Sequence, residues 1–138
     1  MSLLEIIGEL ITPGPIGGLD FGDHVSNDKL KYIPIRFAIS LIIICLIEYY
    51  FVFRPDIFDV KSAFVKVNII LWTYLLISYV LRVKPNYSNT GWVPFLINNP
   101  FRFSDNINRF LVLIEIIFYP GKYISRSIIG FIKYCRGQ

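Results

Sequence analysis

Residues 37–53 read FAISLIIICLIEYYFVF, an apolar run in which Glu48 is the one charged residue. Seventeen residues reach the lower limit for a helix that crosses a bilayer. Arg36 precedes the run and Arg54 follows it, so a basic residue flanks each end. A soluble helix that is apolar on all sides needs a large protein around it. The run therefore predicts a first transmembrane helix.

A second apolar run, AFVKVNIILWTYLLISYVL, occupies residues 63–81. The connection between the two runs is short, so the two helices that it joins are expected to be antiparallel. Asp59 or Ser62 is placed to cap the second helix, because short polar side chains bind free N–H groups at helix starts. The sequence predicts a transmembrane hairpin within residues 29–84, with spans at about 37–53 and 63–81.

Each predicted span carries one charged side chain, Glu48 in the first and Lys66 in the second. An ionisable residue inside a membrane is costly and often has a function. One hypothesis is therefore that Glu48 carries a proton or binds a cation. In an antiparallel hairpin, however, Lys66 lies at the same depth as Glu48. The sequence therefore favours a structural ion pair between these two residues.

Before the hairpin, residues 1–28 combine a short amphipathic helix with a Gly- and Pro-rich loop. Apolar residues recur at helical spacing over residues 2–11, and Pro13 ends the pattern. The loop is expected to cover residues 12–28. A helix this short is stable only against a membrane or a partner protein.

After the hairpin, residues 85–109 are rich in Pro, Asn and aromatic residues and have no helical or strand periodicity. An irregular segment of this length is unusual unless it binds something. We expect it to be an extended docking segment. Its candidate contacts to partners or lipid headgroups are Trp92, Phe95, Phe101 and Phe103.

The last segment, residues 110–138, starts with an apolar run that Pro120 and Gly121 are expected to break or kink. The part after Gly121 is amphipathic, with a basic face made by Lys122, Arg126, Lys133 and Arg136. This pattern is typical of a basic helix lying in the membrane interface, and it predicts a kinked interfacial or re-entrant helix. The alternative is a third, kinked transmembrane helix over residues 107–132.

Composition agrees with a membrane protein of one domain. The chain has 138 residues, is 54% hydrophobic and 17% charged, and has a net charge of +4. Its basic residues flank apolar runs, which indicates contact with a membrane surface rather than with nucleic acid. Lys and Arg are more numerous at the hairpin ends that connect to the N- and C-terminal segments than at the loop between the two spans. Both termini are therefore expected on the inner side of the membrane.

No catalytic, cofactor or metal motif emerges from the sequence. Asp20, Asp23, His24 and Asp28 form the one cluster of His and carboxylates, but they lack a metal-ligand spacing. The two cysteines, Cys45 and Cys135, form no disulfide framework, and palmitoylation of Cys135 is an alternative to a free thiol. We expect no enzyme activity and no cofactor, with bound lipids as the one plausible class of ligand.

The predicted fold is an all-α membrane protein: a two-helix transmembrane hairpin with amphipathic interfacial helices before and after it. We expect a non-catalytic structural or assembly subunit of a large membrane-associated complex, whose partners are other subunits and the bilayer. The frequent use of Ile, Lys, Asn, Phe and Tyr suggests an AT-rich genome, which fits a respiratory-type supernumerary subunit of the mitochondrial inner membrane. It also fits a membrane-anchored minor component of a viral capsid with an internal membrane. The alternatives are a small homo-oligomeric, holin-like pore and a membrane-remodelling hairpin.

Overall fold

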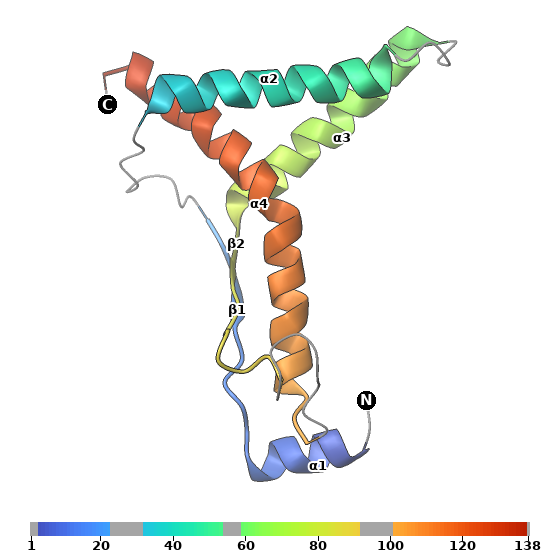
Figure 1. Ribbon diagram of the computed structural model, residues 1–138, viewed down its shortest axis with the longest axis vertical. Helices are drawn as coiled ribbons and strands as arrows, with labels where there is room; N and C mark the ends of the chain where they lie inside the picture. The colour runs from blue at the N-terminus through green and yellow to red at the C-terminus, as the bar shows by residue number, and fades with distance from the viewer. Residues whose placement is uncertain (1–2, 23–31, 54–58, 92–100, 138) are drawn as a thin grey trace. The chain divides into compact units, whose positions relative to one another are not determined.

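The computed structural model describes residues 3–22, 32–53, 59–91 and 101–137. The elements in chain order are α1 (Leu3–Ile11), β1 (Gly18–Phe21), α2 (Ile33–Val52), α3 (Val60–Val80), β2 (Leu81–Lys84) and α4 (Ser104–Cys135), as Figure 1 shows. They form two compact units. Unit 1 comprises Met1–Phe21 and Leu81–Phe118, and unit 2 comprises Gly22–Val80 and Tyr119–Gln138. Helix α4 contributes its first half to unit 1 and its second half to unit 2.

Both predicted spans are helices in unit 2. Helix α2 starts before the predicted residue 37, because Pro34 in its first turn needs no N–H partner and has a backbone already suited to a helix. Helix α3 starts at Val60, because the Asp59 carboxylate accepts a hydrogen bond from the Ser62 N–H at 3.2 Å. The predicted capping role of Asp59 is therefore confirmed. Both helices are long and apolar enough to cross a membrane.

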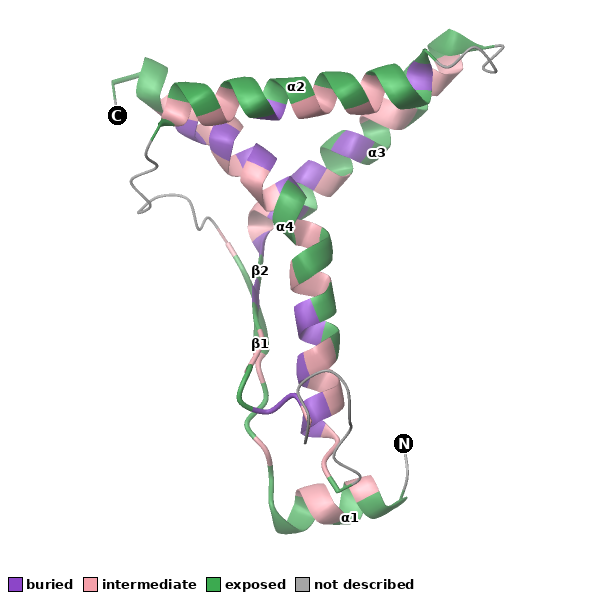
Figure 2. Cartoon of the chain, viewed as in Figure 1, coloured by how far each residue is buried: buried purple, intermediate pink, exposed green. Residues whose placement is uncertain are grey.

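Helices α2 and α3 bury few of their residues. In the most apolar window of each helix, 11% of the α2 residues and 17% of the α3 residues are buried. Figure 2 shows exposed and half-buried residues along most of both helices. Large apolar side chains such as Ile42, Leu46 and Ile70 are among the exposed ones. Within the described residues, other parts of the chain therefore cover little of the surface of these two helices.

Helix α4 runs without interruption through Pro120, so of the two predicted alternatives at Pro120-Gly121, a break or a kink, the break is wrong. The Gly121 N–H donates to the Tyr74 hydroxyl at 3.1 Å, and α3 thereby supplies a partner next to the proline. The Ser125 hydroxyl shares its proton between the carbonyl oxygens of Gly121, at 2.7 Å, and Leu75, at 2.8 Å. These side chains thus bind both backbone polar groups of Gly121, the residue that follows the proline.

The second half of α4 packs against both hairpin helices. Leu71 and Leu75 of α3 form a buried cluster with Ile124 of α4. At the N-terminal part of α2, the rings of Phe37 and Phe131 stack with centroids 4.0 Å apart. Unit 2 is thus a three-helix packing in which α4 contacts the start of α2 and the end of α3 (Figure 1).

Unit 1 contains a two-stranded antiparallel sheet, so the protein is mostly helical rather than all-α. Strands β1 and β2 pair with Gly18 opposite Lys84 and Phe21 opposite Leu81. Strand β1 lies in the predicted loop of residues 12–28, and β2 includes the last residue of the predicted second span. Both strands are short, and their partners are far apart in the chain, so no local pattern indicates them.

One face of the sheet packs on the first half of α4. Leu81 and Val83 of β2 are buried against Leu111, with Ile107, Ile114 and Phe118 around them. The predicted docking segment of residues 85–109 is therefore only partly irregular, because α4 already begins at Ser104. The segment's residues 92–100 lie outside the described residues. The predicted N-terminal helix is confirmed as α1.

Substitution of Gly17 tests the close approach between this residue, which precedes β1, and the end of β2. A Cβ added at Gly17 would overlap the Lys84 carbonyl oxygen, whereas a Cβ at Gly18 would have no atom within 4 Å. We expect Gly17→Ala to lower the thermal midpoint of unfolding, because a backbone atom cannot move aside cheaply. Gly18→Ala is the matched control and should leave the midpoint nearly unchanged. Circular dichroism melts in detergent measure both, and equal midpoints would contradict the described approach.

Candidate functional site

Beside its apolar cluster, unit 1 contains a buried polar network, and the centre of this network is the side chain of Asn108, which is fully buried. The Asn108 Oδ1 accepts hydrogen bonds from the N–H groups of Gly17, at 2.8 Å, and Asn86, at 3.2 Å. The Asn108 Nδ2 donates to the carbonyl oxygens of Pro15 and Asn89, both at 2.9 Å. The carboxamide thus uses two acceptor and two donor positions, which is its ordinary full capacity. One α4 side chain therefore joins the segment before β1 to the segment after β2.

A second buried amide extends this network to the start of α4. The Asn89 Nδ2 donates to the Pro15 carbonyl oxygen at 3.1 Å and to the Ser104 hydroxyl at 2.8 Å. The Arg109 Nε donates to the carbonyl oxygen of Thr90 at 2.7 Å. Since buried polar groups are costly unless they are paired, this network fixes the path of residues 85–91 over α4.

The Glu9 carboxylate joins α1 to the N-terminus of α4. Its Oε1 accepts from the Gly14 N–H at 2.7 Å, and its Oε2 accepts from the Ser104 N–H at 3.0 Å. Desolvation, the largest single influence, raises the pKa of Glu9, but the hydrogen bonds from Gly14 and Ser104 together hold it below its ordinary value. A carboxylate is also favoured at a helix N-terminus by the helix dipole. In the sequence, Glu9 is one residue of the predicted amphipathic helix over residues 2–11, and no local pattern indicates its contact with Ser104.

The outer surface of unit 1 is apolar. Leu3, Leu10 and Ile11 of α1 are 74–80% exposed, and Phe110 and Ile116 of α4 are 62–67% exposed. Unit 1 therefore has buried amides inside and large apolar side chains outside. Such surfaces mark contact with a membrane or with another protein.

Unit 2 contains a small basic pocket. Arg36 of α2 and four α4 residues line a cavity of about 110 Å³, and the α4 residues are Tyr119, Lys122, Tyr123 and Arg126. The Arg36 guanidinium lies over the Tyr123 ring, 5.6 Å from its centroid. The predicted basic face thus brings Lys122 and Arg126 together with an arginine that the sequence placed only at the edge of a span.

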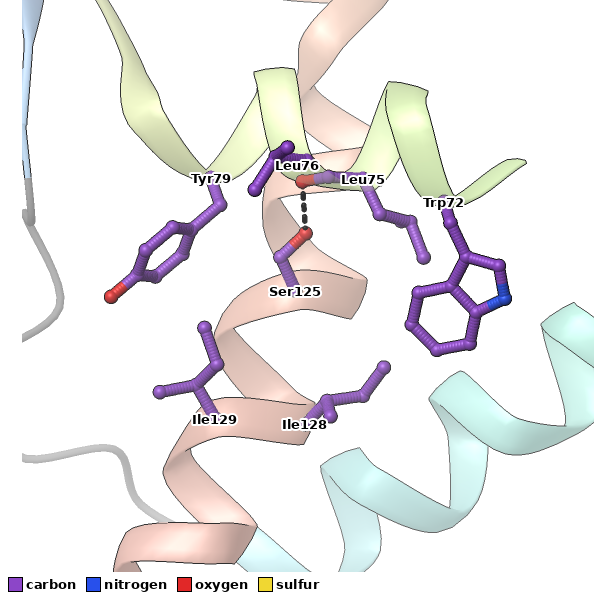
Figure 3. Close-up of a pocket in the computed structure, with 7 residues that line it drawn as sticks. All are labelled: Trp72, Leu75, Leu76, Tyr79, Ser125, Ile128 and Ile129. Carbon is purple, nitrogen blue, oxygen red and sulfur yellow. Dashed lines mark hydrogen bonds between the residues drawn. The ribbon is translucent and has the colours of Figure 1, made fainter. Parts of the chain in front are cut away.

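A larger apolar groove lies between α3 and the second half of α4 (Figure 3). Its volume is about 340 Å³, and the Leu75–Ser125 hydrogen bond crosses it. The lining residues are Trp72, Leu75, Leu76, Tyr79, Ser125, Ile128 and Ile129. A groove with this lining is suited to hydrocarbon rather than to a polar ligand.

The predicted ion pair between Glu48 and Lys66 is not formed in the structure, where Glu48 is half-buried and Lys66 is exposed. The neighbouring residues Ile47 and Val67 line a groove between α2 and α3, and neither Glu48 nor Lys66 is among the residues that line it.

The other predicted site residues are scattered. Trp92 and Phe95 lie outside the described residues, whereas Phe101 is exposed and Phe103 is half-buried. The Phe101 backbone lies against Gly8 of α1, so closely that a Cβ there would overlap its carbonyl oxygen. Lys133 and Arg136 belong to α4 and its end but do not line the basic pocket.

The predicted cluster of acids around His24 is only partly described. Asp20 forms an ion pair with Lys84 across the two strands. Asp23, His24 and Asp28 lie outside the described residues. In the ranges that the structure describes, no group of three or more His, Cys, Asp or Glu side chains is arranged to hold a metal ion.

Replacing Asn108 with Asp tests the buried network. The carboxylate keeps the acceptor position but removes both donors. The Pro15 carbonyl oxygen keeps the Asn89 Nδ2 as a donor, whereas the Asn89 carbonyl oxygen loses its described partner, at about 1–3 kcal/mol for one unpaired group. We expect Asn108→Asp to destabilise unit 1 by about 1–3 kcal/mol. Asn106→Asp, on a less buried position of the same helix turn, is the control. Limited proteolysis of residues 85–91 measures the loss, and equal protection in both variants would contradict the network.

The pKa of Glu9 predicts how stability depends on pH. Because this pKa is lowered in the folded chain, the ionised carboxylate stabilises the fold above its ordinary pKa of 4.5. That stabilisation is lost as pH falls below 4.5 through the lower, folded-state pKa. We expect Glu9→Gln to lower the melting temperature at pH 7 and to flatten its fall below pH 4.5. Glu5→Gln, one turn earlier on α1, is the charge-matched control, and identical pH profiles for both variants would refute the role of Glu9.

Comparisons of this chain with protein-family models, with curated proteins and with solved structures found no match in any of the three.

Proposed function

We propose that the protein is a non-catalytic anchoring subunit of a larger membrane-associated assembly. In this proposal α2 and α3 cross the bilayer, and unit 1 is the part that docks to other subunits. The observation that carries the proposal is the distribution of polarity: large apolar side chains point outward, while serines and amides are buried.

The buried serines of unit 2 support insertion into lipid. Ser40, Ser78 and Ser127 are almost fully buried, and each hydroxyl donates to the carbonyl oxygen four residues earlier on its own helix. A hydroxyl satisfied in this way needs no water, so it is tolerated in a hydrocarbon environment. Small residues at helix contacts, here also Gly121 against Ser78, are typical of helices that pack within membranes.

The chain path places unit 1 on one side of the membrane in this proposal. The first part of unit 1 ends with β1, which precedes α2 in the chain. Its second part begins with β2, directly after α3 ends. In an antiparallel hairpin these two points lie on the same side. Arg36, Arg82 and Lys84 lie near that side, and the distribution of basic residues favours the inner face.

A subunit is favoured over a pore by the polar side chains of α3. Asn68 and Trp72 are hydrogen bonded to each other at 3.2 Å, and the Asn68 amide also donates to the Phe64 carbonyl oxygen at 3.0 Å. They do not form a polar stripe with Ser78, which is buried against α4. The exposed apolar face of α1, by contrast, is suited to a protein partner. A respiratory-type complex and a capsid with an internal membrane both remain proposals for the assembly.

Native purification in mild detergent, followed by mass spectrometry, tests the docking role. We expect several different proteins to co-purify with the chain. Leu3→Asp should reduce their recovery at least tenfold, because Leu3 is 77% exposed on α1 and an acid in the first helical turn does not destabilise the helix. Gly18→Asp adds the same charge at an open position of unit 1 and should retain the partners.

The contrary outcome is a single species that forms rings or conducts ions in liposomes, which would replace the subunit proposal by the pore. Extraction of native membranes with alkaline carbonate tests the anchor separately. We expect the chain to stay with the lipid pellet, and its release would overturn the transmembrane assignment of α2 and α3.

A further inference from the structure

We infer that the basic pocket of unit 2 binds the phosphate of an anionic phospholipid headgroup. The pocket is lined by Arg36, Tyr119, Lys122, Tyr123 and Arg126. The inference rests on the proposed membrane insertion of α2 and α3, and it adds a specific lipid ligand to that proposal.

The pocket is built by two elements that converge. On α4, Tyr119, Lys122, Tyr123 and Arg126 follow at spacings of three and four residues, so they share one face of the helix. Arg36 reaches the same space from the first turn of α2 and lies over the Tyr123 ring. The stacked rings of Phe37 and Phe131 hold the two helices together beside it. The site therefore depends on the packing of unit 2 and not on one flexible segment.

The charge of the pocket favours an anion. Three cationic side chains face one cavity, and none of the described residues that line it is acidic. Cationic side chains that line one cavity attract an anion by Coulomb interaction. Arginine guanidinium groups suit phosphate oxygens in particular, because their N–H groups can bind two oxygens at once.

The size and position of the pocket favour a headgroup phosphate. About 110 Å³ has room for a small ionic group but not for a whole lipid. Arg36 lies in the first turn of a candidate span, which corresponds to the headgroup level of a bilayer. Tyr119 and Tyr123 are of the residue type that is enriched at that level, with an apolar ring and a wet hydroxyl. The apolar surfaces of α2 and α4 next to the pocket would contact the acyl chains.

Lipid binding to the purified full chain tests the inference. The probes are short-chain phosphatidylglycerol, phosphatidylcholine and inorganic phosphate, each titrated in neutral detergent and followed by native mass spectrometry. We expect phosphatidylglycerol to bind at least tenfold more tightly than phosphatidylcholine. Arg126→Gln and Lys122→Gln should each weaken it about tenfold, which corresponds to about 1.4 kcal/mol. Lys133→Gln is the matched control, because Lys133 is a half-buried base of the same helix outside the pocket.

Three results would overturn the inference: equal affinity for both lipids, an equal loss in Lys133→Gln, or displacement of phosphatidylglycerol by equimolar inorganic phosphate. The last result would assign the pocket to a free anion.

Melting curves of the variants show that each is folded, and Arg36→Lys, which keeps the charge, should lose less affinity than Arg36→Gln. Insertion of the wild-type chain into phosphatidylcholine vesicles is scored separately, so failure of the headgroup site is distinguishable from failure of the membrane anchor.

Discussion

The carboxamide of Asn108 is the contact on which unit 1 depends. It bonds four backbone groups that belong to the segment before β1 and the segment after β2. A small unit with few buried apolar side chains gains little from hydrophobic burial, so directional bonds must fix the path of its loops. The Glu9 carboxylate connects α1 to this unit, because it accepts a hydrogen bond from the Ser104 N–H at the start of α4.

The same constraint operates in unit 2 with different residues. Its helices expose most of their apolar surface, so polar groups must be satisfied inside the unit. Ser125 and Tyr74 provide hydrogen bonds at the point where Pro120 removes one, and α4 continues as a helix. Both units thus bury small and polar side chains beside their apolar clusters, and both expose many large apolar side chains to their surroundings.

The sequence was sufficient for features with a local cause and insufficient for those that depend on distant residues. The two long helices follow from apolar runs, and the start of α3 follows from Asp59. The sheet was missed because Gly18 pairs with Lys84 across the entire hairpin. The start of α4 was missed for the same reason, since its N-terminal partner is Glu9, 95 residues earlier. Arg36 was recognised only as a flanking charge, because its contact with Tyr123 exists only in the folded unit.

The division of unit 1 between two distant parts of the chain imposes an order on folding during synthesis. Strand β1 leaves the ribosome first, but β2 follows only after α2 and α3 have been made. At about 5–20 residues per second, the interval between Gly18 and Lys84 is roughly 3–13 s. Through this time β1 has exposed, unpaired edges, and a chaperone or an early-bound subunit would protect it from aggregation. The residues of α2 and α3 are therefore synthesised before unit 1 can be completed.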